Sequence, residues 1–365
     1  MGKLSKEEVI HTTLLGLARR LGPGEKLPTV RQLCSKLSTS RSTMDRVLRV
    51  LESERILTCV QGSGIYVSQH SNQRKIGFVF PGNIGDPLHF SQFWGLIHAA
   101  ALRIAERNGD ELRTYFGCPV GGDGDLEPSA YSLSDDIEAR RLNGLLVAGI
   151  SADALAWLKS SGVPMVSLGS KKGFADASVE FDAASSTGMG VQSLRDAGCK
   201  RVAVVWFSGA PEFEQETDDI TVAFQKTCEK ARIPYKRDFR WTPDVIASGR
   251  GWESLEEAGA EIIRSKWASN GEKPDGIFFA DDTMAHGGLI ALLEAGVKLG
   301  RDVKVASITH KGASLLRPFW PTLIRIELDP EEIVEKMFSL LGKLLQSMKV
   351  ADSTPKIVPT LVLPK

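Results

Sequence analysis

Residues 27–68 read LPTVRQLCSKLSTSRSTMDRVLRVLESERILTCVQGSGIYVS, and this stretch predicts the fold of the amino-terminal part of the chain. A capping box at residues 29–32 begins a short helix, and Ser40 can cap the next helix, which runs to about Glu54. Two short apolar strands then flank the glycine-tipped turn Gln61-Gly62-Ser63-Gly64. This order of elements predicts a winged helix-turn-helix, a fold that places one helix in a groove of DNA.

A further helix precedes this stretch, because Ser5-Lys6-Glu7-Glu8 is a capping box and Gly22-Pro23-Gly24 ends the apolar periodicity that follows it. Residues 1–70 carry eleven Lys and Arg against six Asp and Glu, a net charge of +5. The whole chain is neutral, so the remainder carries −5. A basic head joined to an acidic body is typical of a protein that binds nucleic acid with one end only.

From Lys75 onward the pattern changes to strands that alternate with helices, which indicates parallel sheets. One series ends near Asp182 and a second series follows it, so the sequence predicts an α/β body of two lobes with a cleft between them. Ligands of such sheets bind at the carboxyl ends of the strands. The predicted boundaries are 1–68 for the winged helix-turn-helix domain, 69–74 for a polar linker and 75–365 for an effector-binding and dimerisation domain, with lobe 1 at about 75–182, lobe 2 at about 183–308 and a crossover tail at 309–365.

The chain of 365 residues holds five cysteines, none of them in a CxxC pair, which predicts neither a disulfide framework nor a zinc site. No segment has the composition of a signal peptide or the length of a membrane span, so we expect a cytoplasmic protein with no membrane partner. The sequence contains no Walker loop, HExxH motif, dinucleotide-binding GxGxxG or Ser/His/Asp arrangement. We therefore expect no catalytic activity, no cofactor and no bound metal.

Several motifs resemble those of bacterial regulators. The segments LPTVRQL, TSRST and QGSGIYV, in that order, resemble the DNA-binding domain of GntR-type regulators. Residues 74–365 are similar to the LacI/GalR-type effector domain, which is itself periplasmic-binding-protein-like. The similar segments are KIGFVFP, FWGLIHAAALRIAERNG, GLLVAG, GVPMVSLG, VEFDAASSTGMGVQSLRDAGCKRVAVV and FFADDTMAHGGLIALLEAGVKLGRDVKVASI. The combination resembles the arabinose-repressor type.

The GntR-type resemblance implies which side chains contact DNA. It places Arg31 on a backbone phosphate, and it places the start of the recognition helix, where free N–H groups also point, on phosphates and base edges. Arg41 suits a bidentate contact to guanine. Asp45 departs from the family pattern, which often has Arg there, so base preference is left open. The candidate DNA-binding residues are Arg31, Ser40, Arg41, Ser42, Thr43, Arg46, Gln61, Gly62, Ser63 and Gly64.

The resemblance also implies an effector site between the lobes, but the sequence departs from the sugar-binding pattern. Residues 208–225 lack the Arg that relatives use to hold sugar hydroxyls and carry five acidic residues instead. Residues 307–310 read Ser-Ile-Thr-His where relatives have Gly-Phe-Asp-Asp, whereas Asp281 and Asp282 match the family's cleft acids. The candidate effector-binding residues are His89, Phe90, Phe93, Asp182, Trp206, Trp241, Asp281 and His310, for each of which a core, hinge or capping role is the alternative.

Together these features predict a ligand-responsive transcription regulator, in particular a repressor. We expect a homodimer that binds double-stranded DNA at a two-fold operator and senses a sugar or related small molecule. The acidic residues near the cleft would suit a polyol, an amino sugar or a cationic ligand. Two alternatives stay open: a solute sensor that acts through protein contacts, and a regulator whose effector site is degenerate or takes a non-sugar ligand.

Overall fold

The computed structural model describes residues 5–54, 56–68, 73–80, 91–118, 128–169, 173–207, 218–243, 254–348 and 353–364. The chain divides into two compact units. One comprises Met1–Arg74 with Gly109–Glu111, and the other comprises Lys75–Asn108 with Leu112–Lys365. Two of the effector candidates, His89 and Phe90, lie outside the described residues.

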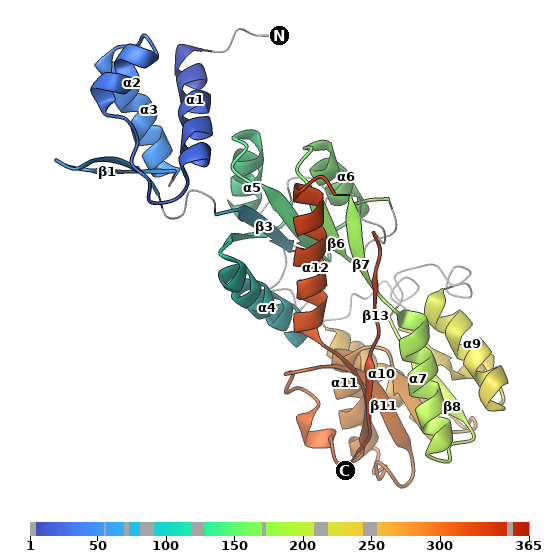
Figure 1. Cartoon of the computed structure of the whole chain (residues 1–365). Coiled ribbons are helices and arrows are strands. Elements are labelled where there is room, and N and C mark those ends of the chain that lie inside the picture. The colour runs from blue at the N-terminus through green and yellow to red at the C-terminus, as the bar shows by residue number, and fades with distance from the viewer. Residues whose placement is uncertain are drawn as a thin grey trace. The chain divides into compact units, whose positions relative to one another are not determined.

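In its described residues, the amino-terminal unit is the winged helix-turn-helix that the sequence predicts (Figure 1). Its elements are α1 Lys6–Leu21, α2 Val30–Lys36, α3 Arg41–Ser53, β1 Leu57–Val60 and β2 Gly64–Val67. Apolar side chains from all three helices and from the hairpin share one core, in which none of the following is more than 3% exposed: Ile10, Leu14, Leu33, Met44, Leu51 and Leu57.

Each helix of this unit begins at the cap that the sequence predicts. Ser5 and Thr29 each accept a hydrogen bond from the backbone N–H three residues later, and each is part of a closed capping box. Ser40 Oγ accepts a hydrogen bond from Thr43 N at 3.2 Å. A capping side chain contributes roughly 1 kcal/mol, so the Ser40 cap fixes where α3 begins and where its free N–H groups point.

The wing is the hairpin of β1 and β2, which pair antiparallel with Val60 opposite Gly64. Gly62 at its tip has a φ of 75°, a left-handed conformation that glycine adopts without steric cost. A Cβ at Gly64 would lie 2.7 Å from Lys26 Cε. The absence of a side chain at this glycine therefore lets Lys26 lie against the hairpin.

The second unit contains two six-stranded sheets, one in each lobe (Figure 1). Across the sheet of lobe 1 the strands are β13 Lys356–Ile357, β7 Ala177–Phe181, β6 Met165–Leu168, β5 Gly144–Ala148, β3 Lys75–Phe80 and β4 Glu111–Phe116. Across the sheet of lobe 2 they are β14 Thr360–Val362, β12 Leu323–Leu328, β11 Lys304–His310, β10 Gly276–Phe279, β8 Val202–Val205 and β9 Arg240–Trp241.

The two sheets have the same topology. From β3 to β13 in lobe 1, and from β9 to β12 in lobe 2, the recorded neighbours pair in parallel, whereas β14 is antiparallel to β12. In each lobe the strand order reverses beside the first strand, between β3 and β5 in lobe 1 and between β8 and β10 in lobe 2. Such a switch point opens a crevice at the carboxyl ends of the strands, which is where ligands of these sheets bind.

Helices cover both sheets. In lobe 1 they are α4 Gln92–Asn108, α5 Pro128–Glu138, α6 Ala152–Ser160 and α12 Pro330–Leu345. In lobe 2 they are α7 Ala183–Asp196, α9 Asp219–Ala231, α10 Leu255–Ala268 and α11 Asp282–Glu294, with short 3-10 turns η1 Arg237–Phe239 and η2 Arg317–Phe319. Figure 1 shows α12 lying along the sheet of lobe 1 beside α4, although it follows the last long strand of lobe 2.

The chain therefore passes between the lobes more than once. It leaves lobe 1 after β7, returns with α12, and passes again between β13 and β14. Short connections of this kind are where two lobes can move as rigid bodies.

Helices α10 and α11 pack backbone against backbone. A Cβ at Gly287 would lie 1.8 Å from Glu256 O, and one at Gly259 would lie 2.1 Å from Met284 O. Neither position admits a side chain without moving a helix. This contact holds the start of α11, where Asp281 and Asp282 lie, in a fixed place.

Candidate functional site

The start of α3 presents a cluster of hydroxyls and an exposed guanidinium. Ser40 Oγ lies 3.0 Å from Ser42 Oγ and 2.9 Å from Thr43 Oγ1. The Arg41 side chain is 85% exposed, and Asp45 Oδ2 is 3.9 Å from its Nε. Because an exposed ion pair this long contributes little, Arg41 is available to an external partner.

A groove of about 770 Å³ lies between α3 and the wing. The turn of residues 61–64 forms one wall, so the structure places Arg41 and the four wing candidates along the same groove. Its charged lining residues are the basic Lys26, Arg41 and Arg49 and the acidic Asp45 and Glu52.

The other candidates for DNA contact lie outside this lining. Arg46 is 61% exposed and forms an ion pair of 3.0 Å with Glu7, so it faces α1 rather than the wing. Arg31 is exposed on α2. Arg46 therefore has an internal partner, which makes it a weaker candidate than Arg41.

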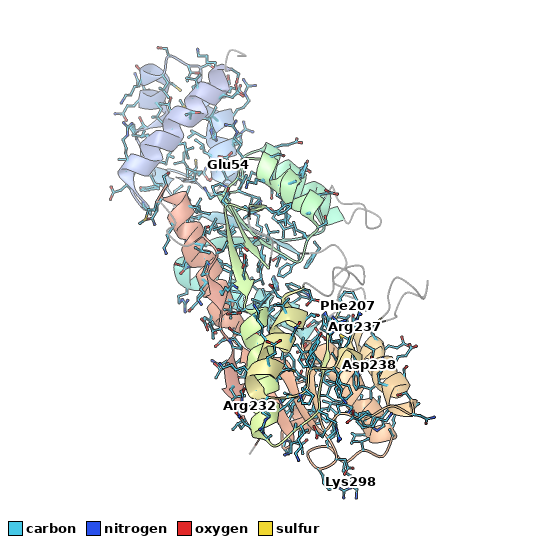
Figure 2. All side chains as sticks on the ribbon, turned by 90° about the vertical axis from the view of Figure 1, so that its right-hand side faces the viewer. Glu54, Phe207, Arg232, Arg237, Asp238 and Lys298 are labelled. Carbon is cyan, nitrogen blue, oxygen red and sulfur yellow. The ribbon has the colours of Figure 1, made fainter. Side chains whose placement is uncertain are left out.

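A second polar site lies at the carboxyl ends of β8, β10 and β11, which are neighbours in the sheet of lobe 2. His310 Nδ1 lies 2.9 Å from Asp282 Oδ2, and their side chains are 9% and 2% exposed. Phe207, which follows Trp206, is 46% exposed at this edge. Figure 2 shows Phe207 at one end of lobe 2 and Lys298, which lies before β11, at the other.

Several buried polar atoms at this edge have no hydrogen-bond partner among the described residues. A buried polar group without a partner costs about 1–3 kcal/mol, so these atoms are candidates for hydrogen bonds to a ligand or to ordered water. The sequence indicated Trp206 but not the threonines, whose role depends on burial. The atoms are Trp206 Nε1, Thr242 Oγ1, Asp282 Oδ1, Thr283 Oγ1 and Thr309 Oγ1.

Lobe 1 contributes the start of α4 to the same site. The Phe93 ring lies 4.5 Å from the His310 ring and 5.8 Å from that of Phe181. Gln92 Oε1 accepts hydrogen bonds from Ser314 N at 3.0 Å and Leu315 N at 3.2 Å. Phe93 thus connects α4 to the end of β11, and Gln92 connects it to the segment that follows.

Asp281, which lies beside this cluster, caps a helix. Its Oδ1 accepts a hydrogen bond from Met284 N at 2.8 Å and caps α11. Burial, and then the neighbouring charge of Asp282, raise the pKa of Asp281 to about 6. Two adjacent carboxyls at the switch point thus favour one bound proton or a donating ligand.

Two sequence-predicted candidates have satisfied internal roles. Trp241 is 3% exposed in the core of lobe 2, and its Nε1 donates to Asp238 O at 2.7 Å. Asp182 caps α7 by accepting from Ser185 N at 2.9 Å and Ser185 Oγ at 2.7 Å. Since an indole has one donor, Trp241 has none left for a ligand.

The fold thus combines a winged helix-turn-helix head with a two-lobed α/β body, and each part matches a protein family. Residues 17–67 match the family described as bacterial regulatory proteins, gntR family. Residues 191–363 match the periplasmic binding protein-like domain.

Two curated relatives match part of the chain. The HTH-type transcriptional regulator GalR of Streptococcus thermophilus is 30% identical over 168 residues, which is 46% of this chain and 46% of the relative. The HTH-type transcriptional repressor PurR of Yersinia pestis bv. Antiqua is 27% identical over 139 residues, 38% of this chain and 37% of the relative. The chain thus spans less than half the length of either relative.

Solved structures share the fold of most of the chain. The transcription regulator CcpA of Lactococcus lactis has a TM-score of 0.60 at 20% identity, covering 80% of this chain and 98% of its own. A LacI-family regulatory protein of Chloroflexus aggregans has a TM-score of 0.63 at 19% identity, covering 80% and 97%. A LacI-family transcriptional regulator of Enterococcus faecium, solved with bound ribose, has a TM-score of 0.59 at 19% identity, covering 79% and 97%.

The described residues contain neither a membrane-spanning helix nor a cluster of metal ligands. None of their helices combines the length and the apolar character needed to cross a membrane. Nor do three or more of their His, Cys, Asp or Glu side chains gather in a group that could hold a metal ion.

Proposed function

We propose that this chain is a ligand-responsive transcription regulator that represses by binding an operator through α3 and the wing. One observation carries the proposal: the groove of α3 and the wing, with the exposed Arg41 on its wall, belongs to a head that matches the gntR family. The first residues of a recognition helix are the ones that reach base edges, and Arg41 is the first residue of α3.

The proposed effector site is the carboxyl edge of the lobe 2 sheet, between β8 and β10. Asp282 Oδ1, which has no hydrogen-bond partner among the described residues, can accept from a donor of the ligand, while Trp206 Nε1 supplies a donor of its own. A small molecule rich in hydroxyl or amine groups satisfies both. The bound ribose in the Enterococcus faecium structure supports a carbohydrate or polyol as the first class to test.

Coupling to DNA would follow from lobe movement in a homodimer. Gln92 of lobe 1 contacts the segment after β11, and Phe93 contacts His310 at the end of β11. A ligand bound beside these contacts therefore changes the relative free energies of the lobe arrangements. In a two-fold dimer such a change alters the separation of the two heads on a palindromic operator.

Two measurements test the proposal. Electrophoretic mobility shifts with DNA upstream of the chain's own gene should give binding that weakens steeply with salt, because phosphate contacts release counterions. A thermal-shift series against pentoses, hexoses, polyols, amino sugars and sugar acids should give a concentration-dependent rise in Tm for one class. Salt-insensitive binding of the head would favour a sensor that acts through protein contacts, and would count against the regulator.

A further inference from the structure

Two acidic side chains, Asp45 and Glu52, line the groove between α3 and the wing. Glu52 accepts a hydrogen bond from Cys59 N at 3.0 Å, which ties it to the wing backbone. Asp45 is 43% exposed, and its ion-pair partner among the described residues is Arg41 at 3.9 Å. Of the two acidic side chains that line this groove, Asp45 is therefore the one free to contact an occupant.

The position of Asp45 on α3 follows from helical geometry. Arg41, Asp45 and Arg49 are spaced four residues apart, so they form one stripe, and all three line the groove. Arg49 Nε donates to the backbone oxygen of Asp45 at 3.3 Å, which leaves the Asp45 carboxylate unoccupied by Arg49. Arg46, on a different face, pairs with α1.

Electrostatics restricts where such a carboxylate can lie against DNA. Phosphates repel it, so a recognition helix tolerates it only where a hydrogen-bond donor faces it. In the major groove, Asp accepts characteristically from the N4 amino group of cytosine. Arg41 and Asp45 are about 6 Å apart along the helix axis, and base pairs repeat about every 3.4 Å, so both can reach base edges one or two steps apart.

We propose that Asp45 is a specificity-determining residue that reads the amino edge of cytosine, close to the base that Arg41 reads. The proposal rests on the DNA-binding function proposed above. Asp45 rejects guanine and thymine at its position, since both present acceptors there, and its charge weakens binding to non-cognate DNA.

Selection of duplexes from a randomised library by the purified full chain tests this at one fixed salt concentration. Wild type, Asp45→Ala, Asp45→Asn and a control, Glu25→Gln, are compared. Glu25 is exposed and outside the groove lining, and its substitution removes the same charge. Wild type should select cytosine at one position of each half-site. In Asp45→Ala, discrimination there should fall by about 5- to 100-fold while non-cognate binding strengthens.

The asparagine variant gives a positive readout, because Asn pairs with adenine N6 and N7 and should shift the preference at that position towards adenine. Glu25→Gln should select the wild-type motif. Identical motifs for wild type and Asp45→Ala would overturn the proposal, and so would an equal loss of affinity for all sequences. If the wild-type chain enriches no motif, the proposed sequence-specific DNA binding itself is contradicted. Circular-dichroism melts of each variant separate a folding defect from a change of preference, and the near-isosteric Asp45→Asn keeps the test valid if the alanine variant unfolds.

Discussion

At the scale of single residues, Arg41 is the side chain whose loss should matter most to the head. Its side chain is 85% exposed on the groove, and its ion-pair partner among the described residues, Asp45, lies 3.9 Å away. Arg41→Ala should weaken operator binding by roughly 5- to 150-fold, the effect of losing a bidentate base contact. Fluorescence anisotropy with labelled operator measures this. Arg20→Ala, at an exposed site near the end of α1, removes the same charge, and equal losses in the two variants would reduce Arg41 to a general electrostatic role.

Asp281 should make the stability of the body depend on pH. Its pKa is about 6 in the folded chain, raised first by burial and then by Asp282, against about 3.9 in the unfolded chain. The folded state thus binds more protons between about pH 4 and 6, so the stability associated with this carboxyl is present at low pH and is lost as pH rises through 6. Asp281→Asn keeps a capping oxygen, so in urea unfolding it should be more stable than wild type at pH 8, by a margin that shrinks towards pH 4.

Asp182 is the matched control, because its pKa is shifted in the opposite direction to that of Asp281. Burial acts to raise its pKa, but the hydrogen bonds from Ser185 outweigh that effect and lower it below the usual value. The charged form is therefore favoured in the folded state, and Asp182→Asn should be less stable than wild type at pH 8, with a deficit that vanishes at low pH. Equal pH profiles for the two variants would contradict the assignment of Asp281.

At the scale of elements, the contact of α10 with α11 depends on glycine. A Cβ at Gly287 would lie 1.8 Å from Glu256 O, so Gly287→Ala must separate the helices and should cost about 1–3 kcal/mol or more of unfolding free energy. Gly95 on α4 has nothing within 4 Å of an added Cβ. Gly95→Ala should therefore stabilise by about 0.5–1 kcal/mol through helix propensity. Chemical denaturation of both variants measures the contrast, and a neutral Gly287→Ala would mean that the helices can slide apart freely.

Elements determined by local chemistry could be predicted from the sequence. The caps Ser5, Thr29 and Ser40 fix the helix starts of the head, because each acts within four residues of chain. The strand β4 was not predicted, since most of its side chains are only half-buried and give no buried run, and the short helices α5 and α6 were also missed.

The polar cluster at the carboxyl edge of lobe 2 could be predicted only in part, because it joins distant segments. His310, Asp282 and Phe93 meet through the topology of two lobes, and residue types alone do not give that register. The same limit applies to Trp241, whose indole N–H is satisfied by Asp238 O, a backbone partner that no sequence pattern indicates.

At the scale of the whole molecule, the contact between Gln92 and the segment after β11 should couple ligand binding at the proposed effector site to the arrangement of the two lobes. Gln92 bonds two backbone N–H groups, of Ser314 and Leu315, and these bonds exist only while the lobes keep this arrangement. In the same arrangement, polar atoms of the proposed effector site are buried without a partner in the described part of the chain, so a ligand that pairs with them favours this arrangement too. The Gln92 contact and the ligand should therefore be mutually stabilising.

Gln92→Ala should then weaken effector binding by about 10-fold, equivalent to about 1.4 kcal/mol. This loss is expected although Gln92 is not among the buried polar atoms with which the ligand is proposed to pair. Isothermal titration with the compound that raises Tm measures the change in Kd. Linkage requires that the same variant respond to that compound only at correspondingly higher concentration in an operator-binding assay. Gln225→Ala is the matched control, since Gln225 lies on α9 and bonds only Glu229 within that helix among the described residues. An unchanged Kd in Gln92→Ala would show that the two lobes respond to the effector independently of this contact.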